Sequence, residues 1–183
     1  EVDQTEPVNL YGSTKRLGEI ALEQSGCVFI NFRTCWVYGS HGNNFIKTML
    51  KLASTREELS IIDDQIGAPT SAALIADVTA HALKFYLLSN TETQKSLHGH
   101  YHLAAQGECS WFDYANFVFE RVKQKSQILA IKKINAIETS AYPTPAKRPL
   151  NSRLDTMKLQ TNFKINLPNW KQGVAQVLEE ITQ

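Results

Sequence analysis

The chain has 183 residues, of which 43% are hydrophobic and 20% are charged, within the usual range for a globular domain. Its formal net charge of +1 is too small for the positive stripe that nucleic-acid binders present to phosphates. No apolar run approaches the roughly 20 residues of a membrane-spanning helix, and the first residues lack the basic and then apolar order of a signal peptide. We therefore expect a cytoplasmic protein that binds neither nucleic acid nor membrane.

The first half of the chain alternates helical and extended patterns. Leu17, Ile20 and Ala21 recur at helical spacing and Gly26 can end the helix, which predicts a helix over residues 11–24. After it, the sequence predicts a buried strand, a turn, a helix, a second strand and a long helix that starts at a Pro-Thr-Ser cap signal. The corresponding ranges are 27–32, 39–44, 45–53, 59–62 and 71–88.

The second half continues the alternation. We expect a strand over 100–104, a helix over 110–123 with Ser110 as its N-cap, a strand over 130–134 and a final helix over 170–181. Strands that alternate with helices favour an α/β fold with parallel pairing. Such sheets usually bind a dinucleotide through a glycine-rich turn after the first strand, but the sequence has no G-x-G-x-x-G spacing. Either the protein binds no dinucleotide, or the part that binds it precedes residue 1.

The cysteines and histidines suggest no metal site. Three cysteines lie far apart without Cys-x-x-Cys spacing, so we expect buried free thiols rather than disulfides or a zinc ribbon. His98, His100 and His102 alternate and would share one side of a strand, as in a zinc site, but no carboxylate or thiolate at ligand spacing completes the set.

Tyr11 and Lys15 are the first candidates for chemistry. They are four positions apart at the start of the first predicted helix, so both side chains project from one face. An ammonium group beside a tyrosine hydroxyl favours the phenolate, which makes the tyrosine a better proton donor at neutral pH. Two polar residues on an exposed helix are the alternative interpretation.

Six segments, in this order and spacing, resemble the dTDP-4-dehydrorhamnose reductase family of extended short-chain dehydrogenases/reductases. They are residues 7–19 (PVNLYGSTKRLGE), 32–39 (FRTCWVYG), 42–45 (GNNF), 64–70 (DQIGAPT), 101–103 (YHL) and 147–155 (KRPLNSRLD). The resemblance covers nearly the whole chain. It implies a cytoplasmic enzyme that uses NADPH or NADH to reduce the 4-keto group of dTDP-4-dehydro-β-L-rhamnose, giving dTDP-β-L-rhamnose for bacterial polysaccharide.

The resemblance also implies roles for single residues. Tyr11 would protonate the C4 oxygen, and Lys15 would assist it and bind the nicotinamide ribose. Arg33 and Thr34 would lie at the cofactor, and Trp36 would pack against the sugar ring. The other implied substrate contacts are Asn43, Asn44, Phe45, Gln65, Thr70 and Arg148, with Phe45 at the thymine and Arg148 at the diphosphate. Each has a structural alternative: turn asparagines, a loop that needs Gly67 and Pro69, or a surface arginine.

The implied architecture is the C-terminal part of a Rossmann-like parallel sheet plus a smaller α/β substrate-binding domain. Residues 1–38 would form the last helix and strand of the Rossmann-like part, and residues 39–183 mainly the substrate-binding region, with 71–125 returning a helix and a strand to the sheet. The glycine-rich loop and the catalytic serine or threonine of the family precede these residues, so we expect the chain alone to be inactive.

The sequence also allows other functions. A non-catalytic binding subunit of the same fold and a reductase or epimerase for another nucleotide sugar are the alternative functions. The partner would be a small-molecule nucleotide sugar, and a homodimer is open. Some family members use magnesium at a subunit contact, but no position here carries its ligands, so no metal residue is assigned.

Overall fold

The computed structural model describes residues 1, 3–125, 129–144 and 146–182. Their elements, in chain order, are α1 (Leu10–Gln24), β1 (Ile30–Arg33), β2 (Val37–Tyr38), α2 (Phe45–Ala53), β3 (Glu58–Ile62), β4 (Ile66–Gly67), β5 (Thr70–Ser71), α3 (Ala72–Leu88), α4 (Thr91–Ser96), β6 (Gly99–His102), β7 (Cys109–Ser110), α5 (Trp111–Gln124), β8 (Lys133–Ile137), the short 3-10 helix η1 (Thr139–Ala141), α6 (Met157–Phe163) and α7 (Trp170–Ile181). No described helix is long and apolar enough to span a bilayer.

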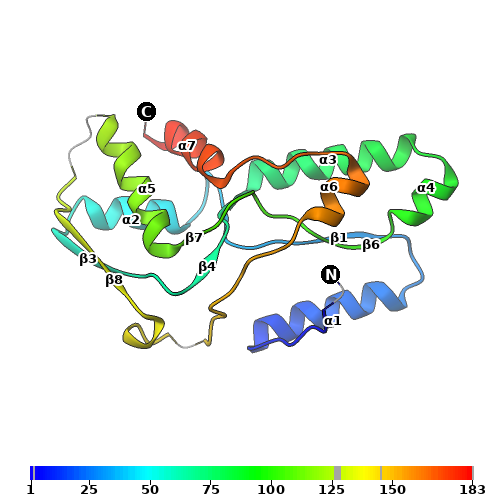
Figure 1. The fold of residues 1–183 in the computed structure, drawn as a ribbon, viewed down its shortest axis with the longest axis horizontal. Helices are drawn as coiled ribbons and strands as arrows, with labels where there is room; N and C mark the ends of the chain where they lie inside the picture. The colour runs from blue at the N-terminus through cyan, green and yellow to red at the C-terminus, as the bar shows by residue number, and fades with distance from the viewer. Residues whose placement is uncertain (2, 126–128, 145, 183) are drawn as a thin grey trace.

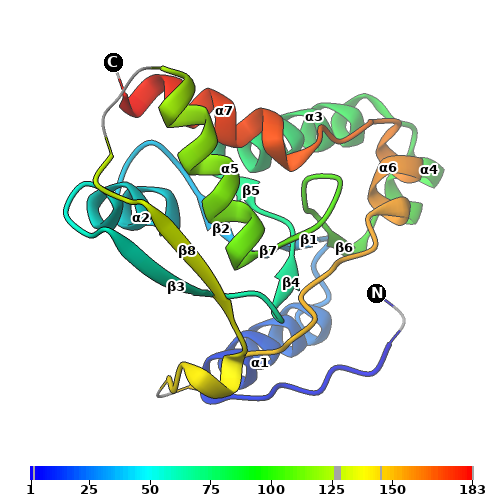
Figure 2. The same ribbon diagram turned by 60° about the vertical axis from the view of Figure 1, so that its left-hand side comes forward.

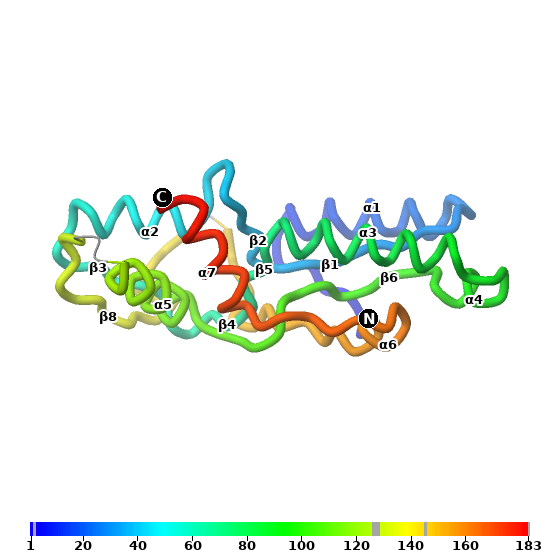
Figure 3. The backbone as a smooth tube through the Cα atoms, turned by 90° about the horizontal axis from the view of Figure 1, so that it is seen from above, coloured from blue at the N-terminus to red at the C-terminus, as the bar shows by residue number. Residues whose placement is uncertain are grey.

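The elements gather at two ends of an elongated molecule (Figure 1, Figure 3). One end holds the β1–β6 pair with α1, α3, α4 and α6. The other end holds the β3–β8 pair with α2, α5 and α7. The short strands β2, β4, β5 and β7 lie between the two ends. Each end has its own cluster of buried apolar side chains.

The strand pairing is mainly parallel. Among the described residues β1 pairs with β6, β2 with β5 and β3 with β8 in parallel, and β4 pairs with β7 antiparallel. The prediction of an α/β fold with parallel strands is confirmed. The one antiparallel pair consists of two-residue strands, Ile66–Gly67 and Cys109–Ser110.

The two faces of the β1–β6 pair differ in chemistry. Phe32 and Tyr101 pair in register and belong to the apolar cluster that α3 and α6 cover. Because strand side chains alternate between faces, Arg33 and His100 point the other way, where they contact the carboxylates of α1. The helices α3 and α1 therefore lie on opposite sides of this pair (Figure 1, Figure 2).

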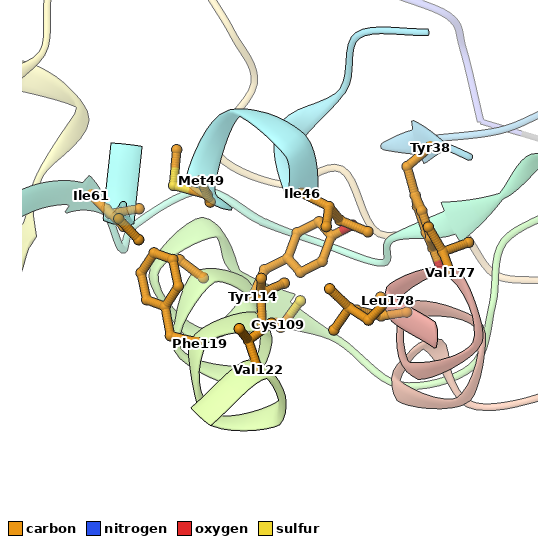
Figure 4. Close-up of a cluster of buried hydrophobic side chains, with 14 of the residues drawn as sticks. Tyr38, Ile46, Met49, Ile61, Cys109, Tyr114, Phe119, Val122, Val177 and Leu178 are labelled. Carbon is orange, nitrogen blue, oxygen red and sulfur yellow. The ribbon is translucent and has the colours of Figure 1, made fainter. Parts of the chain in front are cut away.

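The other end is packed around α5 (Figure 4). Tyr114 is 1% exposed and its ring lies below Ile46 of α2, while Phe119 lies near Met49 and Ile61. Apolar residues of α7 close the cluster from the third side. This core fixes the relative positions of α2, β3 and the start of α5, which line the larger cavity of the molecule.

Some boundaries differ from the predictions. The strand expected at 130–134 lies at Lys133–Ile137, because the N–H groups of Ala130 and Ile131 instead donate to the carbonyl oxygen of Ala53 at the end of α2, at 2.8 and 3.1 Å. The expectation of three buried thiols was wrong: Cys109 is buried, Cys35 is half-buried, and Cys27 is exposed in the connection between α1 and β1.

Candidate active site

Tyr11 and Lys15 lie on one face at the start of α1, where the side chain of Asn9 caps the helix by accepting the Gly12 N–H at 2.8 Å. The Lys15 ammonium lies 5.3 Å from the centre of the Tyr11 ring. Tyr11 is 70% exposed, so its hydroxyl is free to meet another molecule. The structure therefore places a cation beside an exposed tyrosine, and the catalytic role of the pair stays a prediction.

Polar contacts attach α1 to the sheet. The Arg33 guanidinium donates to both carboxylate oxygens of Glu19 at 2.7 and 2.8 Å. These hydrogen bonds hold the pKa of Glu19 below its usual value and raise that of Arg33. The predicted cofactor residue Arg33 is thus engaged within the chain, whereas Thr34, which follows it, is exposed.

The segment between η1 and α6 contacts the start of α1 and then β4 at the centre of the molecule (Figure 2). The Asn9 amide donates to the carbonyl oxygen of Lys147 at 3.0 Å. Three residues later, Leu150 accepts the Ile66 N–H at 2.8 Å, and the Ser152 N–H donates to the Ile66 oxygen at 2.8 Å. The backbone around Arg148 is therefore held between the tyrosine helix and β4.

A cavity of about 810 Å³ opens between α2, β3, the start of α5 and this segment. Phe45, Gln65 and Arg148, three of the predicted substrate contacts, all line it. Its walls combine aliphatic and aromatic side chains, including Trp111, with two guanidinium groups, those of Arg56 and Arg148.

The charge of the cavity favours an anionic ligand. Within the described part of the chain, neither guanidinium has a carboxylate partner, and the lining carboxylate of Glu58 is paired with Lys133 at 3.3 Å and accepts a hydrogen bond from Asn135 at 2.6 Å. Guanidinium groups beside an apolar wall suit a ligand that joins phosphates to a flat ring. Sequence reasoning missed Arg56, because its place in the connection after α2 gave no signal.

Trp36 contacts the cavity lining through Trp111. Its backbone has a φ of 48°, in the left-handed region that residues with a side chain seldom adopt. The Trp36 indole stacks on that of Trp111 with ring centres 3.7 Å apart and planes 15° from parallel. Sequence reasoning missed Trp111, since its position after the Ser110 cap indicated only the first residue of a helix.

The remaining predicted contacts lie elsewhere. Asn43 and Asn44 line a separate cavity of about 340 Å³ near α7. Asn44 also caps α2, donating to the Gly39 oxygen at 2.7 Å and accepting the Lys47 N–H at 3.2 Å. Thr70 is fully buried; its hydroxyl donates to the Ala68 oxygen at 3.0 Å and accepts the Ala105 N–H at 3.3 Å. Asn44 and Thr70 therefore both have contacts within the fold, and their predicted substrate contacts are not tested by them.

The three alternating histidines have separate partners. His98 accepts the Phe29 N–H at 3.1 Å, and His100 lies between Asn31 and Glu23 at 2.9 Å from each. His102 Nδ1 is 3.0 Å from the Asp155 carbonyl oxygen. In the part of the chain that the structure describes, no group of three potential metal ligands comes together.

Comparison with known proteins gives consistent matches. The family described as "RmlD substrate binding domain" matches residues 1–183. The chain is 51% identical over 181 residues to dTDP-4-dehydrorhamnose reductase of Escherichia coli K12, covering 99% of this chain and 59% of that protein.

Two solved structures are also similar. One is dTDP-4-dehydrorhamnose reductase of Bacillus anthracis in complex with NADP, at 32% identity and a TM-score of 0.83, covering 98% of this chain and 58% of that one. The other is the orthologue from Clostridium acetobutylicum, at 30% identity and a TM-score of 0.84, covering 100% of this chain and 59% of that one. The chain thus spans somewhat less than three-fifths of each structure.

Proposed function

Because the chain belongs to the RmlD substrate binding domain family, we propose that the whole protein reduces dTDP-4-dehydro-β-L-rhamnose to dTDP-β-L-rhamnose with NADPH or NADH. The observation that carries this proposal is the 51% identity, over 99% of the chain, to a relative named for that reaction. The exposed Tyr11 and Lys15 pair supplies the chemistry that such a reduction needs from these residues. The partner is a small-molecule nucleotide sugar, and we place the reaction in the cytoplasm.

Tyr11 would donate the proton. The bound nicotinamide cofactor would supply the hydride to C4, and the C4 oxygen gains negative charge as the carbonyl is reduced. The exposed Tyr11 hydroxyl protonates that oxygen, and the Lys15 ammonium stabilises the phenolate that remains. The net change is one C–H bond and one O–H bond formed at the former carbonyl.

The large cavity would take the nucleotide. Its guanidinium groups, Arg56 and Arg148, suit the two phosphates, and Phe45 offers a flat apolar surface to the thymine. Because Arg148 lies on the segment that hydrogen-bonds the cap of α1, a diphosphate held there extends its sugar toward the tyrosine end of the molecule. Asn43, Asn44 and Thr70 lie outside this cavity, and their contacts with the sugar nucleotide stay predictions.

The domain division follows from the same proposal. Residues 1–38 would belong to the dinucleotide-binding domain and residues 39–183 mainly to the substrate-binding region, with 71–125 adding α3 and β6 to the first. The pairing of β1 with β6 supports this division. Tyr11, Lys15 and the exposed Thr34 fit the edge of a nicotinamide site, but the sequence has no glycine-rich turn. We assign that turn to the part of the relatives' length that this chain does not span.

The test joins the remaining part of the E. coli relative to this chain and measures oxidation of NADPH and NADH with dTDP-4-dehydrorhamnose. We expect rapid oxidation by the joined protein. The Tyr11→Phe variant should lower turnover about 10²-fold or more through loss of the acid, with little change in sugar-nucleotide binding.

Tyr86→Phe is the matched control, because it removes the same hydroxyl from a half-buried tyrosine of α3. It should leave turnover unchanged. Equal turnover of Tyr11→Phe and the unchanged protein would exclude Tyr11 as the acid, and a folded joined protein without any oxidation would exclude the proposed reaction.

A further inference from the structure

Both faces of the Trp36 ring are covered. Trp111 stacks on one face, 3.7 Å away. A Cβ added to Gly67 would lie 2.7 Å from Cε2 of Trp36 and 3.0 and 3.1 Å from Cζ2 and Cδ2, the two ring carbons bonded to Cε2. A point at those distances lies above the ring, not beside its edge. Since Trp111 fills the first face, Gly67 covers the second.

Trp111 is itself fixed by hydrogen bonds. Its indole N–H donates to Oε1 of Gln65 at 3.1 Å, and Nε2 of Gln65 donates to the Thr139 hydroxyl at 3.1 Å. Thr139 in turn donates through its hydroxyl to Asp64 at 2.6 Å. Gln65 is 4% exposed, so both ends of a buried amide are used within the chain. Gln65 therefore has a task other than the substrate contact that the sequence predicted.

We propose that Trp111 is a positioning residue for Trp36: Gln65 fixes the Trp111 indole, and Trp111 presses the Trp36 ring onto Gly67 so that only the ring edge can meet the sugar. The inference rests on the proposed function, because it concerns the sugar end of the same ligand. It predicts that Trp111 acts on recognition of the sugar more than on recognition of the nucleotide.

The arrangement suits positioning better than simple core filling. Trp36 and Trp111 are both only half-buried, unlike Trp170, which is 3% exposed in the same apolar cluster. Trp36 also has an unfavourable backbone conformation, which needs compensation from its surroundings. A stacked partner stabilises this backbone conformation and restricts the Trp36 ring to one orientation.

The experiment uses titration calorimetry to compare how tightly the joined protein binds dTDP-rhamnose and dTDP, which lacks the sugar. The variants are Trp36→Phe, Trp111→Phe, the double variant and Gln65→Leu, with Trp170→Phe as the matched control. Far-ultraviolet circular dichroism follows the exciton signal that two stacked indoles produce.

We expect Trp111→Phe to lose the exciton signal and to bind dTDP-rhamnose about tenfold more weakly, while its affinity for dTDP changes less than about twofold. Trp36→Phe should have the same effects, and the double variant should be no weaker than either single one, because both act through one contact. Gln65→Leu should also weaken the binding of dTDP-rhamnose more than that of dTDP. It replaces Trp111→Phe in the comparison if that variant does not fold. Trp170→Phe should retain both signal and sugar preference.

Equal weakening of dTDP and dTDP-rhamnose by Trp111→Phe, or by Gln65→Leu in its place, would overturn the inference, because it would show a structural role alone. Additive effects of Trp36→Phe and Trp111→Phe would overturn it as well. The proposed function fails separately: if the joined protein oxidises no cofactor but these variants still lose the sugar preference, the reaction is wrong and the positioning stands.

Discussion

The attachment of α1 to the sheet can be tested with Glu19→Gln. No residue of α1 is buried, and a helix of 15 residues is marginal on its own, so its docking depends on contacts such as the Arg33–Glu19 pair. Hydrogen bonds to charged groups contribute about 1.5–3 kcal/mol. Because 14% of the Glu19 side chain and 22% of the Arg33 side chain are exposed, solvent screening reduces this to about 1–2 kcal/mol.

The assay is native-state hydrogen exchange of the α1 amides in the 183-residue chain. A loss of about 1–2 kcal/mol corresponds to exchange about five to thirty times faster in α1. The amides of α7 should keep their protection, since that helix is packed in the other core. Glu179→Gln, which alters an exposed glutamate of α7 that has no ion pair in the described structure, is the matched control.

The same pair predicts a pH dependence. The Arg33 guanidinium lowers the pKa of Glu19, so the folded state binds this proton less readily than the unfolded state. The stabilisation is then fully present above the ordinary glutamate pKa and is lost as the pH falls through the lowered value. The Glu19→Gln chain should lack this part of the acid dependence. Unchanged α1 protection in the variant, or a loss shared equally by α7, would refute the reasoning.

Two further predictions concern the interior. Phe163→Ala removes a fully buried ring that packs on Tyr101, so the free energy of unfolding should fall by about 3–5 kcal/mol in denaturant titrations. The control Leu87→Ala, at an exposed site, should change the free energy of unfolding by less than about 0.5 kcal/mol. Equal losses in the two variants would contradict the assigned core. Burial, with help from a nearby carboxylate, raises the pKa of Cys109 to about 12, so iodoacetamide at neutral pH should alkylate the exposed Cys27 and leave Cys109 intact until the chain unfolds. Comparable labelling of both thiols, measured by peptide mass spectrometry, would show that Cys109 is accessible.

Local signals explain which elements the sequence could predict. The predicted ranges of α2 and α7 match the structure to the residue, and the side chains of Asn44 and Asn169 cap the first turns of these helices. Ser110 likewise forms a capping box with Asp113 at the start of α5. Each of these signals lies within four residues of the boundary that it marks, so it can be recognised from the local sequence alone.

The shortest strands could not be predicted. The strands β2, β4, β5 and β7 have two residues each, which is too short for an alternating pattern, and they are recognised only by their pairing. The same holds for the site. Phe45, Gln65 and Arg148 were predicted and share one cavity, but the stacking of Trp111 on Trp36 joins residues whose local sequences give no sign of each other.

The strand pairing also bears on how the chain acquires its fold. Within the described residues, each strand pairs with one that is not its neighbour along the chain: Ile30 must meet Gly99, and Glu58 must meet Lys133. Closing such long loops costs entropy before any contact forms, so folding by this topology is slow. During synthesis β3 leaves the ribosome well before β8, and its unpaired backbone groups can then template other chains. Aggregation should therefore threaten the nascent chain, and chaperones that shield early strands should raise its yield more than ligands that stabilise the finished fold.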